Sequence, residues 1–244
     1  MKWLLKIFKF GLTLAIIGAF AGAAALAAAY YYLEPDLPDI DNLRDVRLQV
    51  PLKVLSQDGM LIGEFGEKRR NPLGFDQVPE RMVQAFLSAE DANFFHHPGV
   101  DYRGLLRAGL QLALTGKKKQ GGSTITMQVA RNFYLSRKKT YTRKLSEIFL
   151  ALRIEKELTK QEILELYLNK IYLGHRAYGV GAAARVYYGK QVDELDLAQT
   201  AMIAGLPKAP SSFNPLANPP RALERRNYVL DRMLELNFIS KAEH

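Results

Sequence analysis

The feature that most constrains how this chain can fold is an uncharged run close to its N-terminus. The 24 residues 10–33 contain no Asp, Glu, Lys or Arg. Because an α-helix rises about 1.5 Å per residue, a run of this length can cross a hydrocarbon layer about 30 Å thick. We therefore expect one transmembrane helix over residues 10–33, which leaves residues 34–244 for any folded domain.

The residues at the two ends of this run predict its orientation. Three lysines precede it and three tyrosines close it: Lys2, Lys6, Lys9, Tyr30, Tyr31 and Tyr32. Positive charge before a first span favours a cytoplasmic N-terminus, and tyrosines are common at membrane interfaces. Residues 1–9 are then a cytoplasmic tail, and the rest of the chain is extracytoplasmic. A cleaved signal peptide is the alternative, because Ala27 to Ala29 offer small residues for cleavage, although the run exceeds the usual apolar length.

The charge balance indicates the kind of partner. Lys and Arg outnumber Asp and Glu by 34 to 25, which gives a net charge of +9 and favours phosphates, nucleic acid or lipid head groups. An extracytoplasmic domain does not meet nucleic acid, so we expect no nucleic-acid partner. The chain has no cysteine, which excludes disulfides, thiol catalysis and cysteine metal sites.

The region after the apolar run divides into a linker and a mainly helical domain. Residues 34–50 contain two prolines and show no sustained period, which indicates a linker. The dipeptide Asp58-Gly59 between two short apolar segments predicts a β-hairpin. From residue 79 onward apolar residues recur at helical spacing. We therefore predict a mainly α domain with a short N-terminal hairpin over residues 51–238, and residues 239–244 look like the start of a following segment.

Several helix ends carry recognisable signals. Ser123 is the predicted N-cap of one helix, Thr159 with Glu162 forms a capping-box pattern, and Gly189 ends another helix. A leucine-rich helix ahead of three lysines predicts either a membrane-surface helix or an ordinary buried one. The expected helices lie near residues 102–115, 123–135, 140–157, 194–205 and 221–236.

A pair of acids follows one predicted helix. Glu90 and Asp91 come just before Phe94 and His97. A carboxyl group crowded by aromatic rings can have its pKa raised by loss of hydration, so that it becomes a usable general base near neutral pH. The alternative is a pair of surface acids beside a turn, and His97 could equally be a hydrogen-bonded structural histidine.

Two further patterns could bind an anion. Gly121, Gly122, Ser123 and Thr124 lie at a predicted helix start, where free N–H groups and the helix dipole favour a phosphate. A simple turn with an N-cap explains the same residues. Two cations and a carboxylate at positions 143, 144 and 147 share one face of a predicted helix. Taken alone, that face is usually an exposed salt bridge.

Four motifs, in this order and spacing, resemble the signature set of the peptidoglycan glycosyltransferases, glycosyltransferase family 51. They are EDANFFHHPG (90–99), GGSTITMQ (121–128), RKLSE (143–147) and ILELYLN (163–169) followed by YLG (172–174). The resemblance covers about residues 50–236. The hairpin and EFGEKRR (64–70) are similar to the N-terminal part of bifunctional class A penicillin-binding proteins. Met127 departs from the family, in which many members have Gln; Gln128 is present.

The resemblance implies a lysozyme-like, mainly α glycosyltransferase domain behind one transmembrane helix, on the outer face of a bacterial cytoplasmic (inner) membrane. It implies an inverting enzyme that polymerises lipid II into β-1,4-linked glycan and releases undecaprenyl diphosphate. The implied partners are lipid II, undecaprenyl-diphosphate-linked glycan, the membrane and other cell-wall synthesis proteins. The implied cofactor is a divalent cation, usually Mg²⁺, whose ligands the sequence does not assign.

The resemblance also implies roles for single residues. Glu90 is the base, Lys144 and Arg143 offset charge on the departing diphosphate, and Glu147 orients a cation or the acceptor. The predicted substrate contacts are Ser123, Thr124, Gln128 and Arg107, and the residues that shape the surroundings of the base are Asp91, Phe94 and His97.

Two other functions are alternatives to the glycosyltransferase. A lysozyme-like lytic enzyme also uses one essential Glu, but the cationic face and the Gly-Gly-Ser-Thr helix start suit departure of a diphosphate and not cleavage of a neutral glycosidic bond. A non-enzymatic membrane scaffold, or a nucleic-acid binder, could use the basic runs at 117–119 and 137–144.

Overall fold

The computed structural model describes residues 2–40, 43, 51–66, 69–116, 122–135 and 140–244. Its helices are α1 (Lys2–Leu33), α2 (Glu80–Glu90), α3 (Tyr102–Thr115), α4 (Ile125–Tyr134), α5 (Tyr141–Glu157), α6 (Lys160–Lys170), α7 (Val180–Tyr188), α8 (Leu197–Gly205) and α9 (Pro219–Glu235). Its strands are β1 (Leu52–Leu55), β2 (Leu61–Phe65), β3 (Arg69–Arg70) and β4 (Ala177–Tyr178), with short 3-10 turns such as η4 (Phe94–His96) and η5 (Leu206–Lys208). The predicted mainly α class is confirmed.

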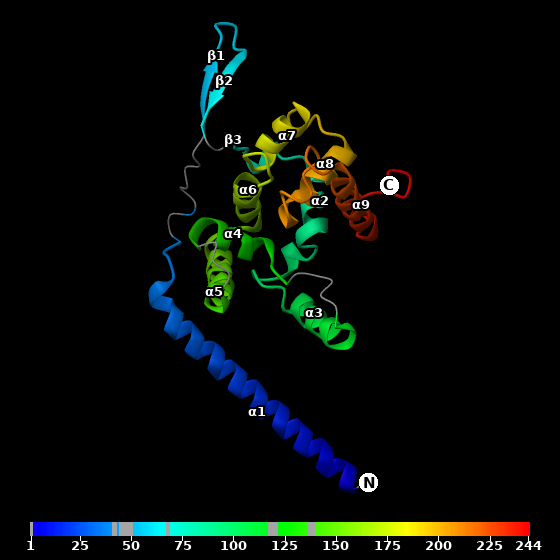
Figure 1. Ribbon diagram of the computed structural model, residues 1–244. Helices are drawn as coiled ribbons and strands as arrows, with labels where there is room; N and C mark the ends of the chain where they lie inside the picture. Colours follow the sequence, from blue (N-terminus) through cyan, green and yellow to red (C-terminus); the bar gives the residue numbers. More distant parts are fainter. Residues whose placement is uncertain (1, 41–42, 44–50, 67–68, 117–121, 136–139) are drawn as a thin grey trace.

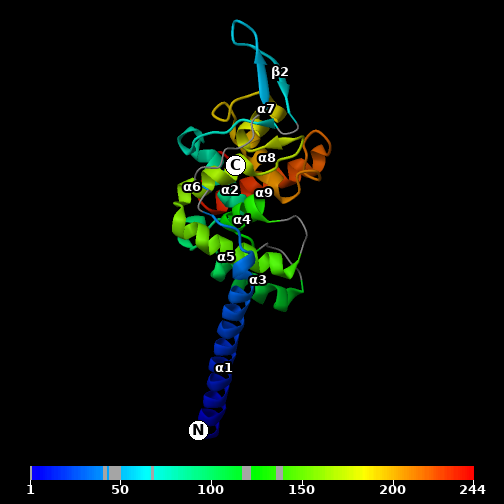
Figure 2. The ribbon, with the colours of Figure 1, turned by 90° about the vertical axis from the view of Figure 1, so that its left-hand side faces the viewer.

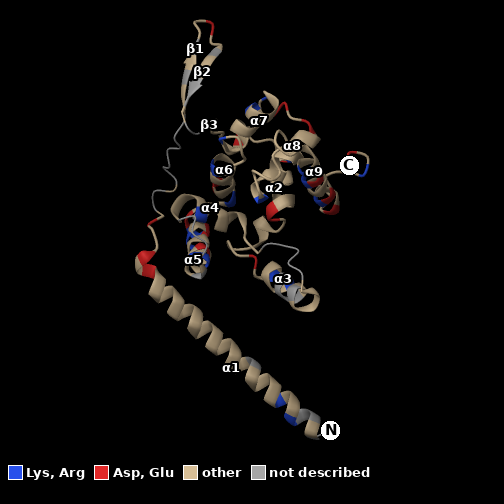
Figure 3. Cartoon of the chain, viewed as in Figure 1, with Lys and Arg blue, Asp and Glu red and all other residues tan. Residues whose placement is uncertain are grey.

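Helix α1 extends away from the folded body as a single long rod (Figures 1 and 2). Its described charges lie near its N-terminus, and acids follow it at the other end (Figure 3). Its most apolar window has a mean hydropathy of 2.1, and none of that window is buried within the protein. The predicted helix over residues 10–33 is therefore present, with the length and composition to cross a membrane.

The predicted hairpin is confirmed and projects from the end of the body opposite α1 (Figures 1 and 2). Strands β1 and β2 pair antiparallel, with Leu52 opposite Phe65. Gly59 has a φ of 82°, a left-handed conformation that glycine adopts without steric cost. The predicted linker precedes this hairpin: residues 41–42 and 44–50 lie outside the described residues, whereas Ile40 and Leu43 are buried in the core.

The core forms where α2 packs against α8 and α9, and where α4 packs against α5 and α6. Helix α2 buries one stripe of apolar residues, among them Met82 and Phe86, as its helical period predicts. Phe86 meets the ring of Tyr167 from α6 edge-on at 5.9 Å. This packing places the C-terminal end of α2 between α4 and α9.

The structure corrects one helix cap and confirms two others. Thr124, not Ser123, is the N-cap of α4, because its hydroxyl accepts a hydrogen bond from the Met127 N–H at 3.2 Å. The capping box of Thr159 opens α6 as predicted. Gly189 ends α7 in the left-handed conformation, with a φ of 67°. The parallel pair β3–β4 was not predicted, since two-residue strands carry no period.

Helix α3 is exposed where a core helix would be buried. Leu106 is 77% and Leu114 76% exposed. Helix α3 lies at the same end of the body as α1 (Figures 1 and 2). The prediction of an ordinary buried helix is therefore wrong for the side chains that the structure describes. The alternative, a helix at the membrane surface, stays a prediction. The lysines at 117–119 lie outside the described residues.

Candidate active site

Glu90 is the last residue of α2, where the helix delivers its carboxylate to the junction with α4 and α9. Its side chain is 14% exposed. Glu90 Oε2 accepts a hydrogen bond from Gln128 Nε2 at 2.8 Å. Arg225 Nη2 of α9 lies 3.8 Å from Glu90 Oε1. The carboxylate therefore has one polar partner on each side and a small opening to solvent.

Burial raises the pKa of the Glu90 carboxyl above its ordinary value, because loss of hydration disfavours the charged form. The Gln128 hydrogen bond opposes this rise, as do the positive charges of Arg225, Arg131 and Lys208. The net shift is upward. A carboxylate with a raised pKa is a stronger base than an exposed one, which is the property a general base needs.

Asp91 joins the end of α2 to the start of α4. Its buried carboxylate accepts a hydrogen bond from the Ile125 N–H at 3.0 Å. It also lies 3.0 Å from His97 Nε2, and His97 Nδ1 accepts the Gly99 N–H at 3.1 Å. Because Nδ1 accepts, the Nε2–H of His97 donates a hydrogen bond to the Asp91 carboxylate, as in a hydrogen-bonded structural histidine. These bonds fix Glu90 relative to α4.

Phe94 supports this junction from within the core. Its ring is fully buried and meets the His97 ring edge-on at 6.1 Å. Lys160 Nζ lies 4.3 Å from the centre of the same ring, a cation–π distance. Phe94 therefore acts on the site through His97 and Asp91.

The cationic face predicted for RKLSE lies on α5, which carries mixed charges along its length (Figure 3). Glu147 is only 1% exposed and is paired with both Arg143 and Lys144, the latter at 2.9 Å. Lys144 Nζ also donates to Ser123 Oγ at 2.6 Å. The alternative of an exposed salt bridge is therefore wrong. The Glu147 carboxylate is buried and pairs with two cations, and a buried ion pair is costly to break.

A cavity of about 330 Å³ lies along these elements. Of the predicted site residues, Glu90, Asp91, Ser123, Thr124, Gln128 and Arg107 line it. Lys144 reaches it through Ser123. The remaining four predicted residues do not line it: Arg143, Glu147, Phe94 and His97. Gly122 lines the cavity, and Gly121 lies outside the described residues.

The cavity residues that the sequence did not predict include five with long polar side chains: Arg131, Lys208, Arg225, Tyr228 and Arg232. The sequence could have indicated Arg131, because this residue lies three positions after Gln128 and therefore on the same helix face. The other four come from η5 and α9, and no spacing links them to Glu90. Together with Arg107, the cavity has five cations against the carboxylates of Glu90, Asp91 and Asp101. An anionic ligand is favoured there.

The described residues do not supply a metal cage. They contain no group of three or more His, Cys, Asp or Glu side chains placed to hold one ion. Asp91 and Glu147 are both engaged, with a histidine and an N–H group in one case and with two cations in the other. Mg²⁺ is often held by one or two carboxylates and by the phosphates of a substrate. These side chains alone do not fit such an ion.

Comparison with known proteins shows which family this chain resembles. The model of the Transglycosylase family matches residues 58–234. Penicillin-binding protein 1A of Pseudomonas aeruginosa is 58% identical over 90% of this chain and 27% of its own length. The Escherichia coli protein of that name is 55% identical over 98% of this chain and 28% of its own. A crystal structure of Haemophilus influenzae penicillin-binding protein 1A covers 81% of this chain and 20% of that one, at 37% identity and a TM-score of 0.46. The chain thus spans little more than a quarter of the curated relatives it matches.

Proposed function

This chain belongs to the Transglycosylase family, and we propose that it is a peptidoglycan glycosyltransferase that joins lipid II units into β-1,4-linked glycan and releases undecaprenyl diphosphate. One observation carries this proposal. The largely buried Glu90 carboxylate opens on the same cavity as Ser123, to which the Lys144 ammonium is bonded. A base that lines the cavity and a cation bonded to a residue of its wall suit transfer from a diphosphate donor.

In the proposed reaction the Glu90 carboxylate takes the proton of the acceptor sugar 4-hydroxyl. The freed oxygen bonds to the anomeric carbon of the donor, and the bond from that carbon to the diphosphate breaks. The electron pair leaves with the diphosphate. A diphosphate is already an anionic leaving group, so it needs cations and not a second proton. One tuned carboxylate is therefore enough.

The leaving group is proposed to lie on the Ser123 side of the cavity. Lys144 Nζ, held by Ser123 and Glu147, supplies a positive charge at a fixed point. Preorganised donors of this kind stabilise charge that develops in the transition state. Arg143 keeps Glu147 occupied, and Arg107 reaches the cavity from α3. A lytic enzyme, which cleaves a neutral bond, has no use for this arrangement.

A divalent cation, usually Mg²⁺, is kept as a proposal. Because the described carboxylates form no cage, the diphosphate oxygens of the substrate would have to supply most of its ligands. Lowering the charge of the diphosphate is what such an ion would contribute. No step of the reaction proposed here depends on this ion, and the roles on the protein side belong to side chains such as Glu90 and Lys144.

The membrane is the proposed location of the enzyme, with α1 as anchor in the cytoplasmic (inner) membrane. The exposed leucines of α3 lie at the same end of the body as α1 (Figures 1 and 2). They suit contact with the lipid surface from which a lipid-linked substrate enters. Other cell-wall synthesis proteins remain proposed partners by resemblance to the family.

The proposed activity predicts release of lipid carrier. Purified chain in detergent, supplied with lipid II and Mg²⁺, is expected to release undecaprenyl diphosphate in step with the loss of lipid II. Excess chelator is expected to slow the release, and added Mg²⁺ to restore it, if the cation lowers the charge of the diphosphate. Chromatography of the lipid fraction measures both species. Intact lipid II after prolonged incubation with folded protein would contradict the proposed activity.

The proposed topology predicts where protease can act. The lysines before the apolar run favour a cytoplasmic N-terminus, so residues after Leu33 are expected outside. Protease added to intact spheroplasts should digest most of the chain and leave a short fragment that carries an N-terminal tag. A cytoplasmic marker protein serves as the control for integrity. Protection of the whole chain until lysis would refute this orientation.

A further inference from the structure

We propose that Arg225 is a positioning residue for the candidate base: its immobilised guanidinium holds the ionised Glu90 carboxylate at the α2–α9 junction. This inference rests on the proposed role of Glu90. Arg225 lies outside the four sequence motifs that carry the family resemblance. It acts through Glu90 and is assigned no bond to the reacting atoms.

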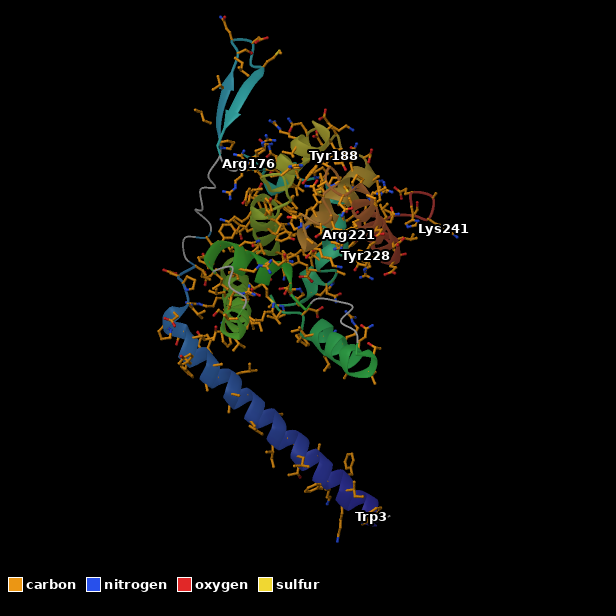
Figure 4. All side chains as sticks on the ribbon, viewed as in Figure 1. Trp3, Arg176, Tyr188, Arg221, Tyr228 and Lys241 are labelled. Carbon is orange, nitrogen blue, oxygen red and sulfur yellow. The ribbon has the colours of Figure 1, made fainter. Side chains whose placement is uncertain are left out.

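Two contacts fix the Arg225 side chain. It is 6% exposed, and its Nε donates to the Gly205 carbonyl at 3.2 Å. Its guanidinium carbon lies 4.5 Å from the ring centre of Tyr228, which Figure 4 labels. Nη2 is then left 3.8 Å from Glu90 Oε1. An arginine held in this way loses little further freedom when it orients a carboxylate.

Gly205 makes room for this arrangement. Its φ of −76° is open to any residue, so the backbone does not require glycine. A Cβ built at this position would lie 2.9 Å from Arg225 Cγ, which is closer than real side chains approach. The absence of a side chain at Gly205 therefore leaves room for the Arg225 side chain beside the last residue of α8.

The other groups that face Glu90 are arranged differently. Gln128 and Arg131 come from α4, Lys208 from η5, and the Tyr167 hydroxyl from α6. Lys208 is exposed, and Arg131 also bonds to Gln128 Oε1 at 3.4 Å. Among the described cations, Arg225 is both buried and within ion-pair distance of Glu90. Its charge is therefore screened little by solvent.

Loss of the Arg225 charge should shift the pH dependence of catalysis in one direction. A base must be ionised, so activity is lost as the pH falls through the pKa of Glu90. Burial raises that pKa, and the Arg225 charge acts against the rise. Without Arg225 the acidic limb of the pH–rate profile should move to higher pH. A cation at ion-pair distance favours the ionised form of a carboxylate, so its removal should lower the rate on the acidic limb.

The test is the pH–rate profile of lipid II turnover for Arg225→Gln. Its acidic limb is expected at higher pH than that of the unchanged chain, with about a tenfold or greater rate loss on the limb and a smaller loss on the alkaline plateau. Arg225→Lys keeps the charge and loses the Gly205 bond, so its limb should fall between the two. Arg226→Gln is the matched control, since this neighbour on α9 bonds to Asn227. An unmoved limb in folded Arg225→Gln, with a uniform loss at every pH, would overturn the proposal.

A second readout does not depend on catalysis. Thermal unfolding of Arg225→Gln, Glu90→Gln and the double variant forms a double-mutant cycle. On the alkaline side, where Glu90 is ionised, Arg225→Gln should lower the Tm by about 2–4 °C or more. In the Glu90→Gln background the same change should lower it clearly less. Equal losses in both backgrounds would overturn the proposal even if the chain proved inactive on lipid II, which would instead contradict the proposed activity.

Discussion

Replacing Glu90 with Gln is expected to reduce glycan formation by about 10²–10⁴-fold, the usual contribution of a positioned general base. The substitution keeps the size of the side chain and its capacity to accept the Gln128 hydrogen bond, but an amide oxygen cannot take the proton of the acceptor hydroxyl. The loss should appear in the catalytic rate, because substrate contacts elsewhere in the cavity are unchanged. Initial rates on lipid II, with circular dichroism as a check on folding, measure it.

The control for this experiment lies on the same helix. Glu80→Gln makes the same chemical change at the opposite end of α2, where the carboxylate is exposed and accepts a hydrogen bond from Gln84 Nε2 at 2.8 Å. It should retain the rate of the unchanged chain. A folded Glu90→Gln enzyme that turned over lipid II at nearly full rate would remove Glu90 from the mechanism.

The second large effect is expected at Lys144. If its ammonium offsets charge on the departing diphosphate, Lys144→Ala should lower the catalytic rate by about 10²–10³-fold, as loss of one preorganised donor typically does. Ground-state binding should weaken less, because the interaction strengthens as charge develops. Lys144→Arg should restore only part of the rate, since a planar guanidinium does not replace a compact ammonium bonded to both Ser123 and Glu147.

Steady-state rates on lipid II, combined with binding of a diphosphate-containing inhibitor, separate the two effects. Lys156→Ala is the matched control, because this lysine is exposed in the last turn of the same helix α5. A defect confined to inhibitor binding would mean that Lys144 docks the substrate. In that case the leaving-group role would belong to another cation of the cavity.

Local patterns predicted most of the helices and one wall of the site. The period of α2, the capping box of Thr159 and the turn at Gly189 each depend on residues a few positions apart, and sequence displays such spacings directly. The same logic missed the N-cap of α4 by one residue. Ser123 and Thr124 are chemically alike, and in the structure Ser123 bonds to Lys144 of another helix while the Thr124 hydroxyl caps α4.

The other wall of the site could not be predicted in this way. Arg225 and Lys208 meet Glu90 only after α8 and α9 pack against α2. An arginine on an amphipathic helix looks the same in sequence whether it faces solvent or a buried carboxylate. The burial of Glu147 was hidden for the same reason, since its spacing to Arg143 and Lys144 is that of an ordinary exposed pair.

The central claim is that the Glu90 cavity builds glycan and does not cleave it, and the most direct measurement is the change in strand length with time. Labelled preformed strands that still carry their diphosphate lipid are incubated with lipid II and the chain, and their length is followed by gel electrophoresis. The labelled strands are expected to lengthen, and Glu90→Gln is expected to stop this growth. Strands that shorten, or that keep their length in the presence of folded, unchanged chain, would contradict it.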